Sequence, residues 1–256
     1  MSSKVVFYTD HYINRTITQF LSKSQNLKLD KIDNFKKYNK ILPCSYGILR
    51  GASEIFDKSE NFIYIDHGYF NSSKRQFTKN KKTLISNLSG YFRIVRNDLY
   101  FNKDYKNENK FRFNSLGIEL KDLNKNGEII IVSEPSEFIL KFLKIPNWTK
   151  ETVALLKKQT DRKLIIHNKF SEIPLKSLMK NAYAFVSCQS TAGYMAITEG
   201  VPAYFTHESL KGYGKIQDIE NRKLNHSLLF SAANSQYRLS EFFSNDFYEY
   251  FNNIAS

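Results

Sequence analysis

The sequence predicts an α/β protein of two domains, each with a largely parallel sheet covered by helices. Short apolar runs of strand length alternate with amphipathic stretches of helix length along most of the chain. The alternation occurs in two series, with a polar segment at residues 121–127 between them. The apolar runs are continuous, which is typical of strands buried on both faces of a parallel sheet. We therefore expect two Rossmann-like halves that face a cleft.

The first series defines an expected N-terminal domain over residues 1–122. It begins with a strand predicted at 5–9 and a helix predicted at 12–21. The other elements predicted in this series are strands at 41–46 and 62–65 and a short helix at 53–56. Residues 71–110 are basic and rich in asparagine, so we expect a loop-rich, exposed region there, interrupted by the mixed run at 91–96.

The second series defines an expected C-terminal domain over residues 123–215. Its predicted strands lie at 128–132, 163–166, 183–187 and 203–206. Its predicted helices lie at 136–143, 150–158, 175–180 and 192–199. Residues 216–256 form a tail in which aromatic-rich amphipathic stretches at 235–243 and 247–251 are predicted to be helices.

The composition is strongly basic, with a formal net charge of +13 and a pI near 9.5. This charge favours polyanionic partners, namely nucleic acid, anionic lipid or phosphorylated metabolites. An AT-rich coding sequence would also enrich lysine and asparagine, so composition alone leaves both explanations open.

Cysteine content and hydropathy argue against a disulfide-stabilised protein and against a membrane-spanning or secreted one. The two cysteines, Cys44 and Cys188, each lie in or beside an apolar run, which argues against a disulfide framework. No apolar run approaches the roughly 18 residues that a transmembrane helix needs, and the N-terminus lacks the pattern of a signal peptide. We therefore expect a soluble cytoplasmic protein.

The turn at residues 187–193 is the strongest candidate for a ligand site. It joins an apolar strand to a helix, and its sequence is Ser-Cys-Gln-Ser-Thr-Ala-Gly. Open amide groups and the positive end of a helix dipole attract phosphate, and the hydroxyl groups of Ser190 and Thr191 add hydrogen-bond donors. The alternative is that these hydroxyl groups only cap the helix.

This turn and the segment after it resemble a known family. Residues 190–193 (Ser-Thr-Ala-Gly) and 199–202 (Glu-Gly-Val-Pro) together resemble the donor-binding end of GT-B fold glycosyltransferases. The resemblance implies that Ser190, Thr191 and Gly193 contact the donor diphosphate and that Glu199 bonds the ribose. It also implies a nucleotide-sugar donor, with a UDP-sugar expected first, no tightly bound cofactor, and a last helix that packs back on the N-terminal domain.

Two further loops are expected at the same edge, because ligands of open α/β sheets bind beyond the carboxyl ends of the strands. Ser133 and Ser136 follow the first strand of the second series, where Ser136 can cap the next helix or donate to phosphate. His167 follows another strand and resembles the basic loop that reaches the nucleotide in related transferases. A polar loop residue without a ligand is the alternative for His167.

A candidate catalytic pair lies in the N-terminal half. Asp66 and His67 follow an apolar strand, and Gly68 permits a sharp turn or a close approach of the backbone. A transferase that inverts the sugar needs a base for the acceptor proton, for which we predict Asp66 first and His67 second. A structural role for both is the alternative. No metal site is predicted, because no His, Cys or carboxylate cluster has ligand spacing.

The acceptor side is predicted from basic and aromatic residues. Arg50 lies between glycines after a strand, where it can reach a phosphate or form a structural ion pair. Arg93, Arg96 and Asn97 lie among aromatic side chains, a combination suited to nucleic-acid contacts, and Tyr69 follows the Asp-His pair. An aromatic core is the alternative.

The overall layout is similar to phage transferases that glycosylate 5-hydroxymethylpyrimidines in DNA. That resemblance implies double-stranded DNA as the acceptor, with the target base leaving the stack, and a host cytoplasm as the location. The first alternative is a transferase for a cell-surface glycan or a lipid-linked acceptor. The second, from a different class, is a non-catalytic nucleic-acid-binding protein on the same fold.

Overall fold

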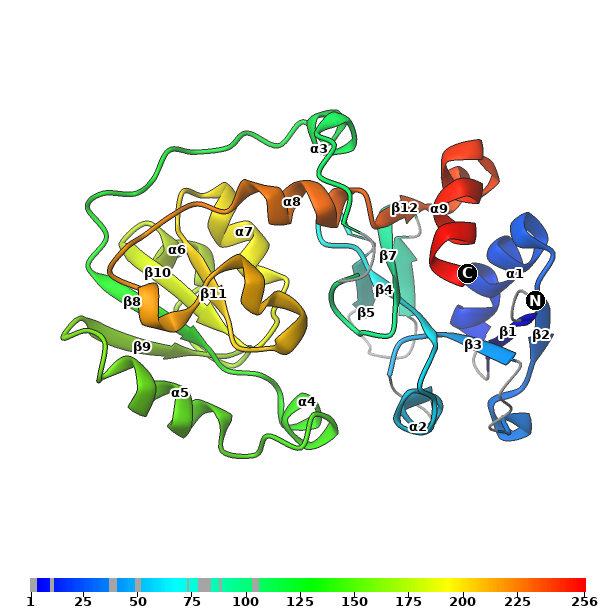
Figure 1. The fold of residues 1–256 in the computed structure, drawn as a ribbon, viewed down its shortest axis with the longest axis horizontal. Helices are drawn as coiled ribbons and strands as arrows, with labels where there is room; N and C mark the ends of the chain where they lie inside the picture. Colours follow the sequence, from blue (N-terminus) through cyan, green and yellow to red (C-terminus); the bar gives the residue numbers. More distant parts are fainter. Residues whose placement is uncertain are drawn as a thin grey trace. The chain divides into compact units, whose positions relative to one another are not determined.

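The chain forms two compact units in a computed structural model (Figure 1). The model describes residues 4–9, 12–36, 41–48, 52–72, 74–77, 84–87, 89–102 and 106–256. Unit 1 comprises Met1–Asn107 with Ala232–Ser256, and unit 2 comprises Glu108–Ser231. Within the described part of the chain, no helix is both long and apolar enough to cross a membrane.

These boundaries differ from those expected at residues 122 and 216. The segment before residue 122 belongs to unit 2 because it packs along the end of a helix there. The Lys121 amide donates to the Thr198 carbonyl (3.0 Å), and the Asn124 amide donates to the Gly200 carbonyl (2.9 Å). Gly200 has a φ of +81°, and a Cβ at this position would lie 2.1 Å from the Asp122 carbonyl oxygen.

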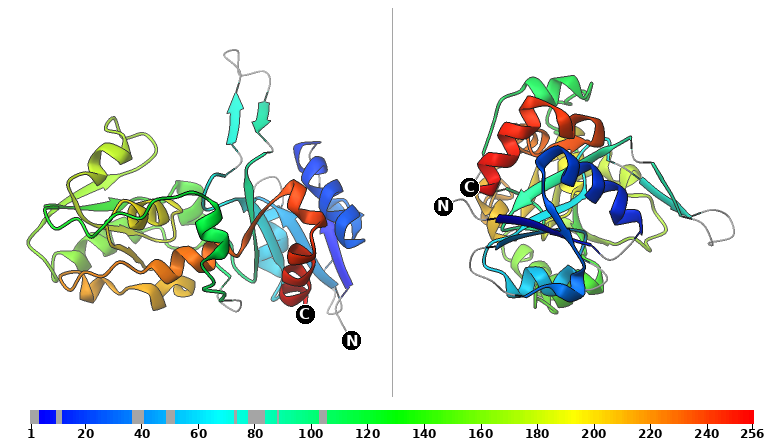
Figure 2. Two further views of the ribbon diagram at one scale, coloured as in Figure 1. Left: turned by 90° about the horizontal axis from the view of Figure 1, so that it is seen from above. Right: turned by 90° about the vertical axis from the view of Figure 1, so that its right-hand side faces the viewer.

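Unit 1 contains a six-stranded sheet in the order β12-β7-β4-β3-β1-β2. Its strands are β1 (Lys4–Tyr8), β2 (Lys28–Asp30), β3 (Ile41–Tyr46), β4 (Ile63–His67), β7 (Tyr91–Arg96) and β12 (Gln236–Arg238). The first four are parallel to one another, whereas β7 and β12 are antiparallel to their neighbours. A separate antiparallel pair, β5 (Lys74–Phe77) and β6 (Leu84–Asn87), projects from this unit (Figure 2).

Helices from both ends of the chain cover this sheet. The helices of unit 1 are α1 (Tyr12–Gln25), η1 (Ile32–Asn34), α2 (Ala52–Lys58), η4 (Leu239–Phe243) and α9 (Asn245–Ala255). Phe7 and Ile17 share one buried core with Phe247 and Tyr250 of α9. The Tyr250 hydroxyl donates to the Ile94 carbonyl in β7, so the last helix is fixed to the sheet of unit 1 by a buried hydrogen bond as well as by packing.

Two expectations for unit 1 are wrong. Residues 91–96, expected within an exposed region, form the buried strand β7 between β4 and β12, because an antiparallel neighbour satisfies its backbone without a crossover helix. Residues 235–243, expected as one helix, divide into β12 and η4, because Gln236–Arg238 completes the hydrogen bonding of β7. Pairing with a distant strand overrides the local amphipathic pattern.

Unit 2 contains a four-stranded parallel sheet in the order β11-β10-β8-β9. Its strands are β8 (Ile129–Ser133), β9 (Lys163–His167), β10 (Ala182–Ser187) and β11 (Ala203–Phe205). Its helices are α3 (Phe111–Ser115), α4 (Glu137–Phe142), α5 (Trp148–Leu156), α6 (Leu175–Met179), α7 (Ala192–Thr198), η2 (Glu208–Tyr213) and η3 (Ile216–Asp218). Every strand and helix predicted for the second series is present in the predicted order. Helix α8 (His226–Ala233) was not predicted.

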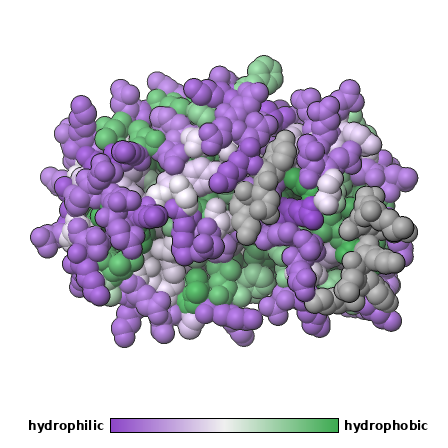
Figure 3. Space-filling model, in the orientation of Figure 1, coloured by the Kyte–Doolittle hydropathy of each residue, from purple (hydrophilic) through white to green (hydrophobic). Residues whose placement is uncertain are grey.

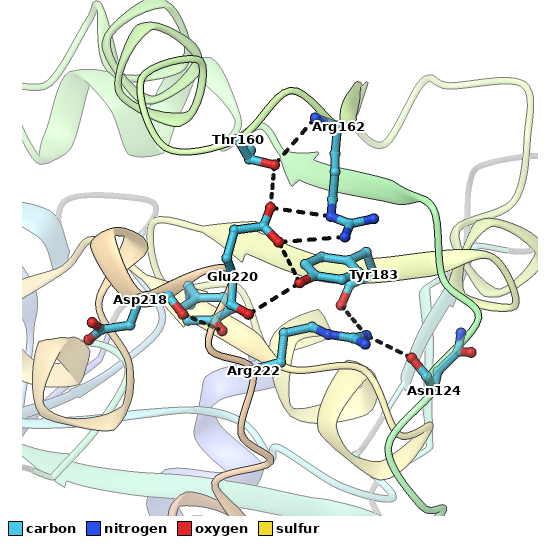
Figure 4. Close-up of polar contacts among 8 residues, drawn as sticks. Asn124, Thr160, Arg162, Tyr183, Asp218, Glu220 and Arg222 are labelled. Carbon is cyan, nitrogen blue, oxygen red and sulfur yellow. Dashed lines mark hydrogen bonds and ion pairs between the residues drawn. The ribbon is translucent and has the colours of Figure 1, made fainter.

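A polar cluster fixes the amino end of β10 (Figure 4). The Tyr183 ring lies between two guanidinium groups, with Arg162 Cζ 3.4 Å and Arg222 Cζ 3.8 Å from its centroid. Glu220 accepts from the Tyr183 hydroxyl (2.7 Å) and pairs with Arg162 (3.2 Å). Arg222 also donates to the Asn124 carbonyl (2.7 Å). The segments around Asn124 and Arg222 are thus tied to the amino edge of the unit 2 sheet.

Candidate functional site

The carboxyl edge of the unit 2 sheet gathers the loops predicted to bind a donor. Ser133, His167 and Ser187 are the last residues of β8, β9 and β10. Ser133 is in register with His167 on one side and with Ser187 on the other. Because neighbouring parallel strands end together, the loops that follow these three residues lie at one edge of the sheet.

The turn after β10 uses part of its hydrogen-bonding capacity internally. Ser187 Oγ accepts from the Ser190 amide (3.1 Å), and Ser190 Oγ accepts from the Ala192 amide (3.2 Å). Ser190 therefore satisfies the first amide of α7 from the position before the N-cap, close to the capping role named as the alternative, and this bond does not prevent its hydroxyl group from donating to a ligand. Thr191 makes no side-chain cap bond, so its hydroxyl group is the one in this turn most available to a ligand.

Gly193 has a packing role in the structure. A Cβ at this position would lie 2.5 Å from Cζ of the Phe205 ring, so glycine lets α7 approach β11 closely. Its predicted contact with a diphosphate stays a prediction.

Gln189 is a candidate that sequence reasoning missed. Its side chain is 3% exposed, and neither Oε1 nor Nε2 has a hydrogen-bond partner among the described residues. Leaving a buried amide unpaired costs about 1–3 kcal/mol, so proteins retain such groups where a ligand or water completes them. The signal in the sequence was an amide in a strand-to-helix turn, but nothing in the sequence showed that it would be buried.

Glu134 is a second missed candidate, at the start of the loop after β8. Its carboxylate accepts from the Thr149 hydroxyl (2.9 Å) and from Asn168 Nδ2 (3.0 Å). Its amide donates to the His167 carbonyl (2.9 Å), which joins the loops after β8 and β9. A carboxylate held in this way is well suited to accept hydrogen bonds from sugar hydroxyl groups.

The remaining residues predicted at this edge have structural partners. Ser136 is the N-cap of α4 and accepts from the Ile139 amide (3.5 Å). His167 Nε2 lies 3.0 Å from the Ile173 carbonyl oxygen, to which it donates, so the ring closes the loop after β9. Ser133 ends β8 and is half-buried. Their roles toward a donor stay predictions.

Glu199 lies at the other end of α7 from the turn. It is the C-cap residue and forms an ion pair with Lys121. The seven residues of α7 span roughly 10 Å at 1.5 Å per residue. A ribose next to a phosphate at the turn would lie closer to the loops after β8 and β9 than to Glu199, so the placement does not favour the predicted ribose contact.

Asp66 of unit 1 lies in a dense polar network at the end of β4. Asp66 Oδ2 accepts from the Tyr64 hydroxyl (2.6 Å) and from Arg93 Nη2 (3.2 Å), and Oδ1 accepts from the His67 amide (2.8 Å). Arg93 also donates to the carbonyl groups of His67 (2.7 Å) and Leu99 (3.0 Å). Both carboxylate oxygens of Asp66 are therefore already hydrogen-bonded.

The charge of this network keeps Asp66 ionised. Burial alone would raise the pKa of Asp66, but the positive charge of Arg93 and the hydrogen bonds from Tyr64 and His67 outweigh it, so the pKa lies below its ordinary value. Burial would likewise lower the pKa of Arg93, but Asp66 and the surrounding tyrosines raise it. A carboxylate with a lowered pKa is a weak base, which favours a structural role for Asp66.

Three predicted residues come directly after Asp66 in the chain, namely His67, Gly68 and Tyr69. His67 is half-buried at the last position of β4, with its ring edge-on to Tyr46. Gly68 permits a close backbone approach, since a Cβ there would lie 2.8 Å from Tyr91 Cβ. Tyr69 is buried, and its hydroxyl donates to the Tyr100 carbonyl (2.5 Å).

The residues predicted to contact nucleic acid have internal partners in unit 1. Arg93 is 5% exposed and lies within 6 Å of the Tyr64, Tyr69 and Tyr100 ring centroids. Arg96 donates to the carbonyl of Ile254 in α9 (2.9 Å). Asn97, with a φ of +56°, forms the turn after β7. The aromatic-core alternative fits this placement better. Arg50 lies outside the described residues.

No cluster of three or more His, Cys, Asp or Glu side chains that could hold a metal ion occurs among the residues whose positions are described. Cys44 and Cys188 are both buried, and burial raises the pKa of the Cys44 thiol.

Comparison with solved structures establishes the fold. No protein-family model matches the sequence, and no curated protein matches it. Thermosulfurimonas dismutans KpsC, beta Kdo 2,4 transferase, matches with a TM-score of 0.50 and 9% sequence identity, over 99% of this chain and 98% of that one. The chain shares its fold.

A second solved structure, Thermosulfurimonas dismutans KpsC, beta Kdo 2,7 transferase, has a TM-score of 0.49 and 12% identity over 91% of this chain and 90% of that one. The predicted class, an α/β protein with two Rossmann-like domains of GT-B-like type, is confirmed by the two sheets and by the first match. Identities this low establish architecture, so activity has to be inferred from the sites themselves.

Proposed function

We propose that this chain is a glycosyltransferase that moves a sugar from a nucleotide-sugar donor to a hydroxyl group of a glycan. The observation that carries the proposal is the carboxyl edge of the unit 2 sheet, where Ser133, His167 and Ser187 end neighbouring strands in register. Ligands of parallel α/β sheets bind beyond this edge. The fold shared with the KpsC Kdo transferase supports the class of reaction.

The donor binds to the loops of this edge. Thr191 donates its amide and hydroxyl groups to the donor phosphate, and Ser190 supports the turn. Gln189 pairs its amide with a polar group of the donor, which satisfies both of its buried atoms. Glu134, held by Thr149 and Asn168, accepts hydrogen bonds from sugar or ribose hydroxyl groups.

The sequence and the fold each suggest one class of donor. A UDP-sugar is the donor expected for the sequence motif. A nucleotide-activated Kdo is the donor expected if the chain shares the sugar named for the KpsC beta Kdo 2,4 transferase.

The reaction is a single displacement. The acceptor hydroxyl oxygen forms a bond to the anomeric carbon, the bond from that carbon to the phosphate oxygen breaks, and the nucleotide leaves with the bonding electrons. The acceptor proton passes to a base. The hydrogen bonds that both oxygens of Asp66 already accept argue against Asp66 as this base, and His67 stays the second candidate predicted from the sequence. Donors at the turn stabilise the charge on the leaving phosphate.

A glycan acceptor is favoured over DNA by the placement of three residues. Arg93, Arg96 and Asn97, on which the DNA acceptor depended, each bond to other groups within unit 1. The net charge of +13 still favours some polyanion, so DNA with 5-hydroxymethylcytosine belongs in the test as a second acceptor.

The test is a transfer assay read by mass spectrometry. The full chain is incubated with UDP-sugars or nucleotide-activated Kdo, and with either a Kdo-terminated oligosaccharide or DNA containing 5-hydroxymethylcytosine. The proposal expects the mass of one sugar added to the glycan. Mass added only to DNA would overturn the glycan acceptor, and no added mass with any pair would overturn the proposal.

A matched pair of variants tests the donor site. Thr191→Val keeps the shape of the side chain but removes its hydroxyl group, and we expect donor affinity to fall about tenfold with the unfolding temperature unchanged. Ser240→Ala removes an exposed hydroxyl group in unit 1 and should leave donor affinity unchanged.

A further inference from the structure

The end of β9 and the loop that follows it, before α6, place large apolar side chains in solvent. Phe170 is 82% exposed, Ile173 is 54% exposed and Ile166 is 50% exposed. These three lie within eight residues of one another, and Phe170 is the most exposed of the large apolar side chains in the described residues. A second group, in unit 1, contains Phe20 and Phe243, whose ring centroids lie 6.1 Å apart. The face drawn in Figure 3 is mostly hydrophilic, with hydrophobic areas between the polar side chains. Exposed apolar patches mark interaction sites when they are concentrated.

Hydrogen bonds hold this loop in a closed shape. His167 donates from Nε2 to the Ile173 carbonyl (3.0 Å), which brings the two ends of the loop together. The Phe170 amide donates to Asn168 Oδ1 (2.9 Å), and the Asn168 amide donates to Ser171 Oγ (3.0 Å). The polar side chains are therefore used to shape the loop. The segment formed by this loop and α6, yellow-green in the left view of Figure 2, projects from the rest of unit 2.

The surroundings of the loop are basic. Residues 163–180 carry four lysines and one glutamate. Lys169 Nζ lies 4.8 Å from the centroid of the Phe170 ring, and Lys163, Lys176 and Lys180 are exposed. Of these lysines, Lys169 lies in the loop and Lys176 in the first turn of α6. Exposed apolar side chains beside such lysines match the two layers of an anionic bilayer surface, since the apolar groups enter the acyl boundary and the ammonium groups meet the headgroup charge.

We propose that the loop of residues 166–173 is a docking surface for an anionic lipid bilayer. Phe170, Ile166 and Ile173 insert at the acyl boundary, and Lys169 and Lys176 contact lipid phosphates. The net charge of +13 adds long-range attraction to the same surface. This inference does not depend on glycosyl transfer: a chain that binds bilayers without moving a sugar would refute the proposed function and leave the docking surface standing.

The loop also follows the strand that carries His167, next to the loop that carries Glu134. Docking here would hold the carboxyl edge of the unit 2 sheet near the lipid surface. An acceptor carried on a lipid would then reach the site by lateral diffusion in the bilayer.

The test is co-sedimentation of the full chain with vesicles. One set contains phosphatidylcholine alone, and the other contains phosphatidylcholine and phosphatidylglycerol in equal amounts. We expect binding to the anionic set only, with release at high salt. The double variant F170S/I173S should bind about tenfold more weakly, which corresponds to about 1.4 kcal/mol. F111S, which removes an aromatic ring that is 76% exposed on α3, is the matched control and should bind like the parent.

Three outcomes overturn the proposal. The first is equal binding to neutral and anionic vesicles, and the second is unchanged binding by F170S/I173S. The third is self-association of the parent chain, abolished in F170S/I173S, without vesicle binding, which would make the loop an interface between copies of the chain. Circular dichroism of F170S/I173S should match the parent, because all the side chains changed are exposed.

Discussion

Replacing Asp66 by asparagine separates a structural role for this residue from a catalytic one. Asp66→Asn keeps the shape of the side chain but removes the charge that faces the buried guanidinium of Arg93. The side chains are 25% and 6% exposed, respectively. Removing one partner of a buried ion pair costs about 3–5 kcal/mol. Arg93 keeps its bonds to two carbonyl groups, and the new amide still offers one oxygen, so we expect about 2–3 kcal/mol.

This loss is large enough to measure by thermal unfolding. A change of 1 kcal/mol shifts the unfolding temperature by about 2–4 °C in a chain of this size, so Asp66→Asn should lower it by about 4–12 °C in circular dichroism. Asp33→Asn, which changes an exposed carboxylate in unit 1, should shift it by less than about 2 °C.

The pH dependence of stability is a second test of the same variant. The pKa of Asp66 is lowered in the folded state, so its contribution to stability is complete above the unfolded value of about 3.9 and is lost as pH falls through the lowered folded value. The difference between parent and Asp66→Asn should thus be constant near neutral pH and shrink in acid. An unchanged unfolding temperature with lost transfer activity would refute the structural reading and make Asp66 the base.

Three further predictions concern unit 2. Gln189→Leu removes two unpaired buried atoms, so we expect it to raise the free energy of unfolding in urea by about 1–2 kcal/mol and to weaken donor binding. A lower free energy of unfolding would show that the amide is satisfied in the folded chain. Gly200→Ala should destabilise the chain by at least about 2 kcal/mol, because the new Cβ would clash with the Asp122 carbonyl and the residue would have to keep a positive φ. An unfolding temperature equal to that of the parent would contradict the tight packing of this segment. Arg222→Met loses the hydrogen bond to Asn124 and the contact with the Tyr183 ring, so we expect the free energy of unfolding to fall by about 1–3 kcal/mol. Thermal unfolding measures this loss, and an unchanged unfolding temperature would mean that this cluster does not stabilise unit 2.

The sequence predicted unit 2 more completely than unit 1 for a physical reason. In unit 2, each strand is followed by a helix that covers it, so the local hydrophobic pattern and the tertiary pairing agree. In unit 1, β7 and β12 pair across a separation of more than a hundred residues, and their hydrogen bonds depend on a partner that local periodicity does not reveal.

The strand ends at the candidate site were predicted from the sequence, but the contacts of the loops that follow them were not. The register of Ser133, His167 and Ser187 follows from the strand order, and the sequence located all three strand ends. The burial of Gln189 and the two partners of Glu134 depend on loops brought together only by the fold. The basic and aromatic run around Arg93 suggested a binding surface, but burial in the sheet turns these residues inward.

The central claim is that the carboxyl edge of the unit 2 sheet binds a nucleotide sugar. Isothermal titration of the full chain with UDP-sugars and with nucleotide-activated Kdo tests it directly, using Glu134→Gln and Thr191→Val beside the parent. We predict saturable binding of one donor per chain, weakened about tenfold or more in each variant, because each loses a hydrogen bond to a charged group. Binding of equal strength in the parent and both variants, or no binding of any donor, would contradict the claim.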